Sequence, residues 1–336
     1  MAIIKGTSGN DNLGKTLNGT AAADEIYGFA GQDTLIGFDG NDVLDGGTGA
    51  DELFGSGGFD MASYRSSKQG VAIDLGMFSF SGGEAQGDTL YSIEGVIGSA
   101  RTDHLRGNDD RNVLRGEAGE DFLQGRAGND VLSGGDGRDI LVGDEGADEL
   151  RGDGGTDFVE YYGSPAGVTV NLATGRGTGG DAEGDRYVSI EAVEGSFFAD
   201  RITGNGAANL LRGDGGADIV TGGGGADRFY IDYESSSADA PDHILDFSRS
   251  QGDRIIPGDG NEDLDGFQPF KFIGQRAFTD VGQLRWYQQN GDTIIEGNTS
   301  DVTPGAELKL VLDPLVRLQS ADFIFAEVGF APDIVA

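Results

Sequence analysis

Aspartate is the side chain in this sequence whose spacing could do chemistry. It recurs every nine residues, as in Asp33, Asp42 and Asp51, and each of these follows a glycine by five positions. The same register runs without a gap through residues 19–63, 98–160 and 195–230. Carboxylate oxygens are the hard ligands that Ca²⁺ and Mg²⁺ prefer. The spacing therefore predicts a series of cation sites.

The repeat that carries each aspartate also predicts the fold. It reads G-G-x-G-x-D-x-U-x, where U is a large apolar residue such as Leu35, Leu44 or Leu53. One apolar residue per repeat suits a short strand that points a single side chain into a narrow core. The glycine-rich half suits tight turns, because glycine tolerates a positive φ. Two repeats then make one coil of a flattened parallel β-solenoid, and successive coils stack.

Stacked coils bring together side chains that lie eighteen residues apart. Two carboxylates placed so closely repel each other unless a hard cation lies between them. Ca²⁺ suits this place because it takes roughly six to eight oxygens, including backbone carbonyls, whereas Mg²⁺ needs a smaller octahedron and releases water reluctantly. Ten pairs are predicted as calcium sites: Asp24–Asp42, Asp33–Asp51, Asp42–Asp60, Asp103–Asp121, Asn112–Asp130, Asp121–Asp139, Asp130–Asp148, Asp139–Asp157, Asp200–Asp218 and Asn209–Asp227.

Glycine carbonyls of the same turns are predicted to complete the ligand sets. The candidate glycines are Gly37, Gly40, Gly46, Gly49, Gly125, Gly128, Gly134, Gly137, Gly143, Gly146, Gly213, Gly216, Gly222 and Gly225. Pairs with Asn112 or Asn209, and pairs at the ends of a block, are expected to bind weakly or not at all. Asp11 has Phe29 eighteen residues on, so the first copy is expected to cap the roll. Aspartate could merely form turns beside glycine, but turn preference would not demand it at one position of nearly every copy.

The nonapeptide resembles the calcium-binding repeat of the repeats-in-toxin (RTX) family. A lone G-x-x-G-x-D would be common by chance in a chain with 61 glycines, but long uninterrupted runs would not. The resemblance implies an all-β fold, a right-handed parallel β-roll, that binds several Ca²⁺ ions. The ten pairs above set the expected number at roughly eight to ten. It also implies a secreted protein, extracellular or associated with the cell surface.

A larger repeat surrounds the small one. Residues 60–75 match residues 157–172, and Ser92-Ile93-Glu94 matches Ser189-Ile190-Glu191, so residues 19–115 and 116–212 form tandem modules. The inserts between the blocks alternate apolar and polar residues and are expected to add irregular coils. They also hold aromatic residues. Tyr64, Tyr161 and Tyr162 are candidate ligands for a sugar or a partner surface, and the favoured alternative is that such rings fill the core.

A different domain is predicted after Tyr230, where the nonads stop. Short alternating strands follow, from Asp242-His243-Ile244 to Ala321-Asp322-Phe323-Ile324, in an order that resembles the C-terminal domain of serralysin-type metalloproteases. The resemblance implies a β-sandwich-like cap that carries the signal read by a type I secretion apparatus. We therefore expect a first repeat and cap at 1–18, a β-roll at 19–230, with final repeats at 213–230, and this domain at 231–336.

Composition and missing motifs exclude several functions. The 58 acidic and 23 basic side chains give a net charge of −35, which argues against nucleic acid as a partner. No apolar run is long enough for a membrane helix, and the start has no signal-peptide pattern, so we expect neither an integral membrane protein nor the general N-terminal export route. H-E-x-x-H, G-x-S-x-G and the phosphate loop do not occur. An enzyme is not expected, although the question stays open.

Two functions fit these observations. The first is a secreted calcium-binding protein that folds on extracellular Ca²⁺ and acts as a binding or host-interaction factor at a cell surface or in a matrix. The alternative is a carbohydrate-active protein, either a polysaccharide-binding module or a uronate epimerase or lyase. It rests on the aromatic inserts and on the likeness to polysaccharide-acting relatives.

Overall fold

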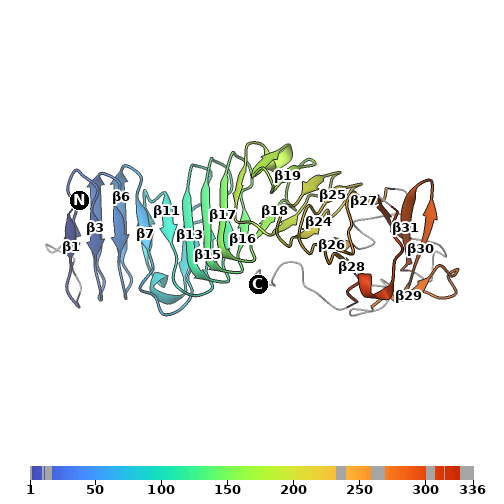
Figure 1. Ribbon diagram of the computed structural model, residues 1–336. Coiled ribbons are helices and arrows are strands. Elements are labelled where there is room, and N and C mark those ends of the chain that lie inside the picture. Colours follow the sequence, from blue (N-terminus) through green and yellow to red (C-terminus); the bar gives the residue numbers. More distant parts are fainter. Residues whose placement is uncertain are drawn as a thin grey trace. The chain divides into compact units, whose positions relative to one another are not determined.

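The regular secondary structure of the described residues is almost all β-strand in a computed structural model (Figure 1). The structure describes residues 2–9, 11, 17–231, 240–258, 269–299, 307–313 and 315–325. They divide into two units, Met1–Asp157 and Phe158–Ala336, and each unit is described by itself. The helical segments of the described residues are three short 3₁₀ turns, η1 (Gly83–Ala85), η2 (Gly180–Ala182) and η3 (Ser320–Asp322), and none has the length and apolarity to cross a membrane.

The first unit is a roll built from parallel strands. One series pairs in the order β1 (Ile3–Lys5), β3 (Glu25–Tyr27), β5 (Val43–Asp45), β7 (Met61–Ser63), β11 (Gly95–Ile97), β13 (Val113–Gly119), β15 (Val131–Gly137) and β17 (Glu149–Gly155). Two shorter series alternate with it along the chain. They are β2 (Leu17–Asn18), β4 (Thr34–Asp39), β6 (Glu52–Gly57) and β10 (Thr89–Tyr91), and β8 (Ala72–Asp74), β12 (His104–Arg106), β14 (Phe122–Gln124) and β16 (Ile140–Val142).

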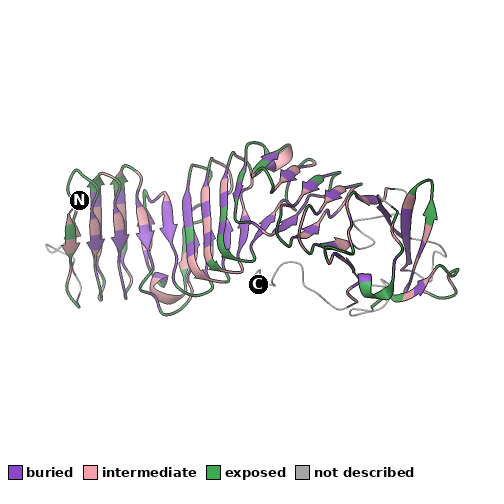
Figure 2. Cartoon of the chain, viewed as in Figure 1, coloured by how far each residue is buried: buried purple, intermediate pink, exposed green. Residues whose placement is uncertain are grey.

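Register confirms the predicted coil of two nonads. Leu114 pairs with Leu132, Leu132 with Leu150, and Leu105 with Leu123, each eighteen residues apart. These leucines are fully buried, which gives each coil one apolar core residue per strand. The banding of buried residues along the strands is visible in Figure 2. The all-β parallel roll is therefore confirmed.

The inserts add coils to the roll, as predicted. In the first insert, β8 pairs in parallel with β12, β10 with β6, and β11 with both β7 and β13. A hairpin from β8 to β9 (Ser79–Ser81) projects from it. The second insert forms β19 (Thr169–Asn171), β20 (Arg176–Thr178), β21 (Arg186–Val188) and β22 (Ala192–Glu194).

The second unit is built from parallel strand series of the same kind. One series is β18 (Phe158–Glu160), β22, β24 (Leu210–Arg212), β26 (Arg228–Ile231) and β28 (Arg254–Pro257). The other is β19, β23 (Arg201–Thr203), β25 (Ile219–Thr221) and β27 (Asp242–Ile244). Roll-type pairing thus extends beyond Tyr230. The domain boundaries at 18 and 230 stay predictions.

The C-terminal strands end one series of the roll. β32 (Leu308–Leu312) pairs in parallel with β27, and an antiparallel meander joins it to β31 (Asp292–Asn298) and β30 (Gln283–Gln289). β29 (Lys271–Gly274) pairs with β30. The predicted strand near Phe323 is instead the 3₁₀ turn η3 followed by a single bridge to Ile255. The predicted signal at the extreme C-terminus lies outside the described residues.

A buried tyrosine cluster fixes the second insert. The Tyr161 hydroxyl lies 2.6 Å from Oδ2 of Asp185 and 2.6 Å from the Tyr187 hydroxyl, and Tyr161 is 2% exposed. Tyr161→Phe removes both contacts, so we expect a loss of about 1–2 kcal/mol of folding free energy in urea unfolding with saturating Ca²⁺. The neighbouring Tyr162→Phe is the control, because Tyr162 is 56% exposed. Equal losses in the two variants would contradict the prediction.

Candidate metal centres

One contact recurs along each edge of the roll and joins the carboxylates in ladders. The backbone N–H of an aspartate at repeat position 6 donates to Oδ1 of the aspartate eighteen residues on, for example Asp103 to Asp121 at 2.8 Å and Asp121 to Asp139 at 2.9 Å. All ten predicted pairs make this contact, at 2.7 to 3.0 Å. The structure therefore brings together every residue pair that the spacing predicts.

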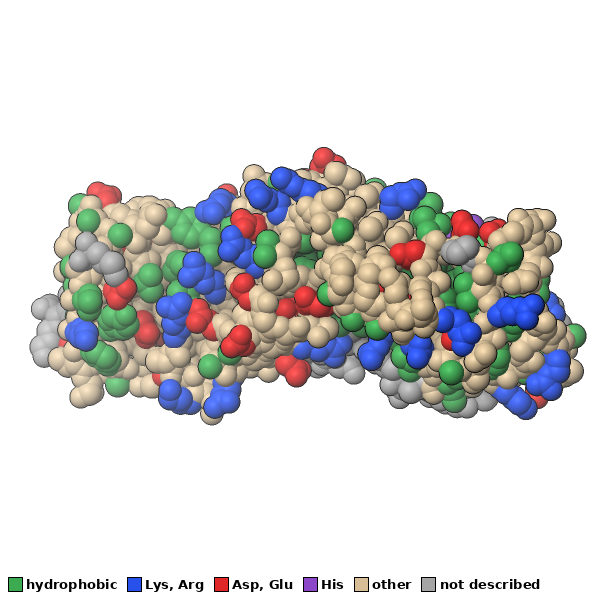
Figure 3. Space-filling view, viewed as in Figure 1, with side chains coloured by type: hydrophobic (Ala, Val, Ile, Leu, Met, Phe, Trp, Pro, Cys, Tyr) green, Lys and Arg blue, Asp and Glu red, His purple; other side chains and the backbone are tan. Residues whose placement is uncertain are grey.

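The second carboxylate oxygen of many ladder aspartates is buried without a hydrogen-bond donor. Asp121 and Asp139 are 0% exposed, and Oδ2 of each has no partner. The other such aspartates are Asp33, Asp42, Asp51, Asp60, Asp130, Asp218 and Asp227. On the face in Figure 3, acidic side chains lie singly or in small groups among basic, hydrophobic and other side chains. A buried, unpaired carboxylate costs several kcal/mol, which a bound cation would remove.

Glycine at position 1 leaves room for these oxygens to converge. A methyl group added to Gly116 would lie 2.2 Å from Oδ2 of Asp121 and 2.5 Å from the carbonyl oxygen of Gly134 in the next coil. Gly125 has the same surroundings, with Oδ2 of Asp130 at 2.3 Å and the Gly143 carbonyl at 2.9 Å. Any larger residue would fill this notch. Carboxylate and carbonyl oxygens thus face one place from two adjacent coils.

Glycine at position 4 permits close stacking of the turns. Gly49 has φ +158°, and a methyl group there would lie 1.5 Å from the Gly31 carbonyl oxygen. Gly58 is placed in the same way over Gly40. An L-residue at either position would collide with backbone. These glycines, like Gly40 with φ +136°, bring further carbonyls to the ladder edge.

Burial and charge give the ladder carboxyls an unusual protonation equilibrium. Burial chiefly raises the pKa of Asp121 to about 8, and the Asp103 and Asp139 carboxylates raise it further. Burial likewise raises the pKa of Asp51, Asp60 and Asp139 to about 6. Burial and the Asp242 carboxylate raise the pKa of Asp218. A charged ladder therefore needs a counter-ion.

Acid should stabilise the calcium-free roll. Folding raises the pKa of these carboxyl groups above the unfolded value of about 3.9. Such a group favours the folded state fully at a pH below the unfolded pKa, and this contribution to stability is lost as the pH rises through the pKa of the folded state. For Asp121 that value is about 8. In chelator we expect the β-sheet circular dichroism signal to grow as the pH falls from about 8 to about 5. A signal that weakens over this range, above the sequence pI of 4.1, would contradict it.

Calcium fits the chemistry of these donors. Each ladder site offers carboxylate oxygens from two coils and backbone carbonyls, which is the all-oxygen set that Ca²⁺ takes at about 2.3–2.6 Å. The described residues hold no cluster of three or more His, Cys, Asp or Glu side chains. Bound calcium would supply positive charge between the coils. Asp33, Asp42, Asp121, Asp130 and Asp139 would hold it, with glycine carbonyls from positions 1 and 4.

Four further carboxylates extend the ladders where the spacing of eighteen fails. Asp51 donates its N–H to Asp88 at 2.9 Å, and Asp60 donates to Glu94 at 2.8 Å. In the second unit, Asp218 donates to Asp242 and Asp227 to Asp253, both at 3.0 Å. Sequence reasoning missed them because each partner lies beyond an insert or in the segment after the nonads. The recurrence of Gly87-Asp88 and Ser92-Ile93-Glu94 at Gly184-Asp185 and Ser189-Ile190-Glu191 was the available signal.

The first copy joins the ladder by another spacing. Asp11 donates its N–H to Oδ1 of Asp33, twenty-two residues on, at 2.6 Å. The chain N-terminal to it contributes as well, since the Ala2 N–H donates to Asp24. These contacts place Ala2 and Asp11 at the start of the roll, where a cap is predicted.

Tyr64 and Tyr161 do not lie where a ligand could stack on them. They are 1% and 2% exposed, and the Tyr64 hydroxyl donates to Asp88 at 3.2 Å. Their rings fill the core, which was the favoured alternative, so the candidate ligand set needs correction. Tyr162 is exposed and contacts Phe197, with the ring centroids 4.3 Å apart.

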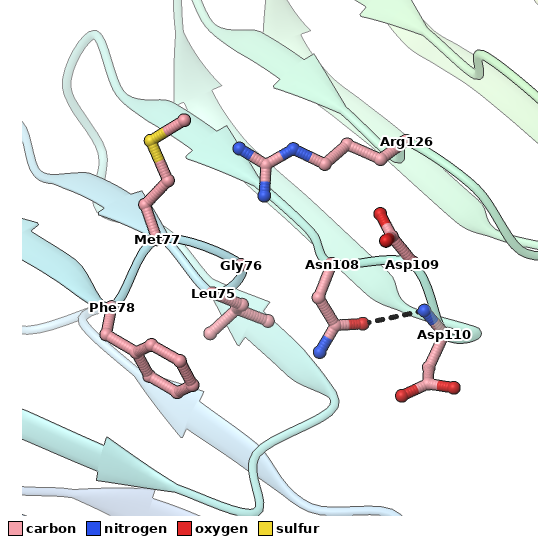
Figure 4. Close-up of a pocket in the computed structure, with 8 residues that line it drawn as sticks. All are labelled: Leu75, Gly76, Met77, Phe78, Asn108, Asp109, Asp110 and Arg126. Carbon is pink, nitrogen blue, oxygen red and sulfur yellow. Dashed lines mark hydrogen bonds between the residues drawn. The ribbon is translucent and has the colours of Figure 1, made fainter.

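A groove of about 510 Å³ lies beside the first insert hairpin (Figure 4). Phe78 and Met77 form one wall and are 73% and 75% exposed. Asp109 and Asp110 line the groove as well. The Arg126 guanidinium is held there by Asp74 at 2.7 Å and by the Gly107 carbonyl at 2.8 Å. The groove thus combines an exposed ring with fixed polar groups.

Comparison with known proteins places the repeats in a family. A family model for the RTX calcium-binding nonapeptide repeat matches residues 16–37, 33–62, 97–132, 124–159 and 194–229. Among solved structures, the chain is similar to the extracellular lipase LipA from Serratia marcescens, with 14% identity and a TM-score of 0.21 over 96% of this chain. The match spans 39% of that lipase chain. No curated protein matches. The chain therefore carries RTX calcium-binding nonapeptide repeats in all three of its nonad blocks.

Proposed function

We propose that this chain is a secreted RTX protein that folds on extracellular Ca²⁺ and acts as a binding or host-interaction factor at a cell surface or in a matrix. The observation that carries the proposal is the array of buried aspartate oxygens without donors, of which Asp121 and Asp139 are examples. At submicromolar Ca²⁺ the charged ladder would repel itself and the chain would stay extended. At extracellular millimolar Ca²⁺, binding free energy would become folding free energy.

Export by a type I secretion apparatus belongs to this proposal. It is supported by the likeness of residues 231–336 to the serralysin C-terminal domain and by a charge of −35 that opposes folding without calcium. The test is co-expression with a type I transporter, with and without residues 231–336. We expect only the full chain in the medium. Equal amounts of both forms in the medium would contradict this route.

The surface role has its own test. Purified chain in millimolar Ca²⁺ is mixed with washed cells, which are sedimented and then rinsed with chelator. We expect the chain to sediment with the cells and to be released by chelator. A chain that stays in the supernatant at all cell densities would contradict a surface-binding role, while leaving calcium-dependent folding intact.

The groove beside the hairpin favours polysaccharide binding as a second candidate function. Phe78 has a positive φ of 52°, whereas the matching residue in the second module is Gly175 with φ 64°. An exposed phenylalanine in this conformation costs of the order of 1 kcal/mol or more, which is typical of functional positions. Its ring could stack on a sugar while Asp109 and Asp110 accept hydroxyl hydrogen bonds.

Phe78→Gly separates this candidate from the first. The substitution copies the second module and relieves the positive φ, so we expect unchanged calcium-dependent folding. On a glycan array in Ca²⁺ the parent should bind and the variant should not. An assay for epimerised or unsaturated uronate on bound glycans then tests for turnover. Absence of glycan binding by the parent would remove this candidate.

A further inference from the structure

The turns of the roll take two forms, which differ at repeat position 2. In the first form, here called the sealed turn, the position 2 N–H donates to the side chain at position 6 of the same copy. Ser99 donates to Oδ2 of Asp103 at 2.6 Å, and Ser196 donates to Asp200 at 2.6 Å. The other position 2 donors of this form are Thr7, Thr20, Asn108 and Asn205.

A sealed turn satisfies its carboxylate with protein donors alone. Asp103 accepts the Ser99 N–H at one oxygen, and the Ser99 hydroxyl at 2.9 Å and the Val71 N–H at 2.7 Å at the other. Asp200 has the equivalent three donors from Ser196 and Val168. Hydrogen bonds of this kind stabilise a carboxylate without a metal.

In the second form, the open turn, position 2 has a left-handed backbone and the N–H no longer seals the carboxylate. Glu117 has φ 76° and Arg126 has φ 74°, and Oδ2 of Asp121 and of Asp130 has no donor. The other position 2 residues with positive φ are Phe29, Phe38, Gly47, Ser56, Gly135, Asp144, Asp153, Asp214 and Gly223. The change from negative to positive φ at position 2 rotates the peptide group between positions 1 and 2. Its C=O then faces the side where the sealed turn has its N–H.

The amino-acid sequence follows the same division. Every open turn has glycine at position 4 and aspartate at position 6. Among the sealed turns the first copy shares both residues, as Gly9 and Asp11, whereas the others have residues such as Arg101, Phe198 and Ala22 at position 4. Both asparagines at position 6, Asn112 and Asn209, lie in sealed turns. Their side-chain N–H groups donate to the carbonyls of Glu94 and Glu191. A sealed turn therefore needs no charge at position 6, and an open turn always has one.

Resting on the proposed calcium binding, we infer that an ion site forms only where the first of two stacked turns is open. The converging oxygens are Oδ2 of that first aspartate and a carbonyl of the following coil. A sealed first turn points an N–H at the same place, which repels a cation. Each nonad block begins with sealed turns: one in the first block, at Thr20, and two in each of the others. These turns would form a roll surface that does not depend on calcium.

This rule redistributes the calcium sites along the chain. Five predicted pairs start from a sealed turn and would take no ion: Asp24–Asp42, Asp103–Asp121, Asn112–Asp130, Asp200–Asp218 and Asn209–Asp227. The pair Asp11–Asp33, whose Thr7 turn is sealed, would likewise take none. The pairs outside the spacing of eighteen that start from an open turn would each take one. At Asp60, Oδ2 has no donor, and the Ser92 carbonyl occupies the place of the glycine carbonyl, 2.0 Å from a methyl group added to Gly55. Glu94 supplies the second carboxylate.

Calcium counting on matched variants tests the rule. Glu94→Gln keeps an acceptor for the Asp60 N–H but removes the charge, so we expect the loss of one ion or roughly tenfold or greater weakening at that site. Asn112→Asp and Asn209→Asp each complete a pair of aspartates eighteen residues apart, in sealed turns. We expect both to bind as many ions as the parent. Equilibrium dialysis gives the count, and circular dichroism in Ca²⁺ checks folding.

The outcomes separate this rule from the function on which it rests. Fewer or weaker ions in Glu94→Gln, with unchanged counts in both asparagine variants, would support it. An additional ion in either asparagine variant, or an unaltered Glu94→Gln, would overturn the rule while leaving calcium binding in place. A parent that binds no calcium would overturn the proposed function and the rule together.

Discussion

Removal of calcium with a chelator at neutral pH is expected to abolish most of the β-sheet circular dichroism signal. The folded roll holds buried carboxylates without donors, such as Asp42, Asp121 and Asp139, and the chain has a net charge of −35. One site at a hundred times its Kd contributes about 2.7 kcal/mol to stability. Several such sites together match the roughly 5–15 kcal/mol by which a typical domain is stable.

The measurement is a calcium titration followed by circular dichroism and by the radius of gyration. A fully unfolded chain of this length has a radius of gyration of roughly 65 Å, far above that of a folded one. The control is Mg²⁺ at the same concentration, which should fold little of the chain because it requires a smaller octahedron. A chain with the same signal in chelator as in Ca²⁺ would contradict calcium-dependent folding.

The nonad pattern predicted the fold because each of its constraints is local. Leucine at position 8 must be buried, and glycine at positions 1 and 4 must approach backbone, so the coil of eighteen residues follows. The register Leu114–Leu132–Leu150 and the contact of Asp121 with Asp139 agree with that prediction. The ladder geometry was predictable for the same reason, since position 6 repeats with the coil.

The features of the site that the sequence did not predict depend on contacts across inserts or on backbone conformation. Spacing alone does not pair Asp60 with Glu94, because the insert changes the number of residues in that coil. The difference between sealed and open turns lies in the φ of position 2 and in one N–H, as at Ser99 and Glu117. Glycine at position 4 with aspartate at position 6 accompanies every open turn, but the sealed turn of Gly9 and Asp11 has both residues too, so these residues alone do not predict the turn form.

Asp139→Asn is expected to act in opposite directions with and without calcium. Asp139 lies in the middle of its ladder, where Oδ1 accepts the Asp121 N–H at 2.9 Å and its own N–H donates to Asp157 at 3.0 Å. Asparagine keeps an oxygen that accepts the Asp121 N–H but removes the negative charge. Asp139 belongs to two predicted sites, and in saturating Ca²⁺ the loss of even one well-filled site should cost about 3–4 kcal/mol of unfolding free energy.

Without calcium, Asp139→Asn is expected to stabilise the folded chain or leave its stability unchanged. Burial raises the pKa of Asp139 to about 6, so at neutral pH its charge opposes folding, and the neutral amide should make the calcium-free chain equally or more stable. The matched control is Asp136→Asn in the same turn, because Asp136 is exposed. Its effect should stay within about 0.5 kcal/mol in both conditions.

Urea unfolding at pH near 7, in Ca²⁺ and in chelator, gives the stability change of each variant in each solvent. A loss of stability from Asp139→Asn that is the same in both solvents would mean that this carboxylate has only a structural role, because only a bound cation makes the charge favourable in one solvent and unfavourable in the other.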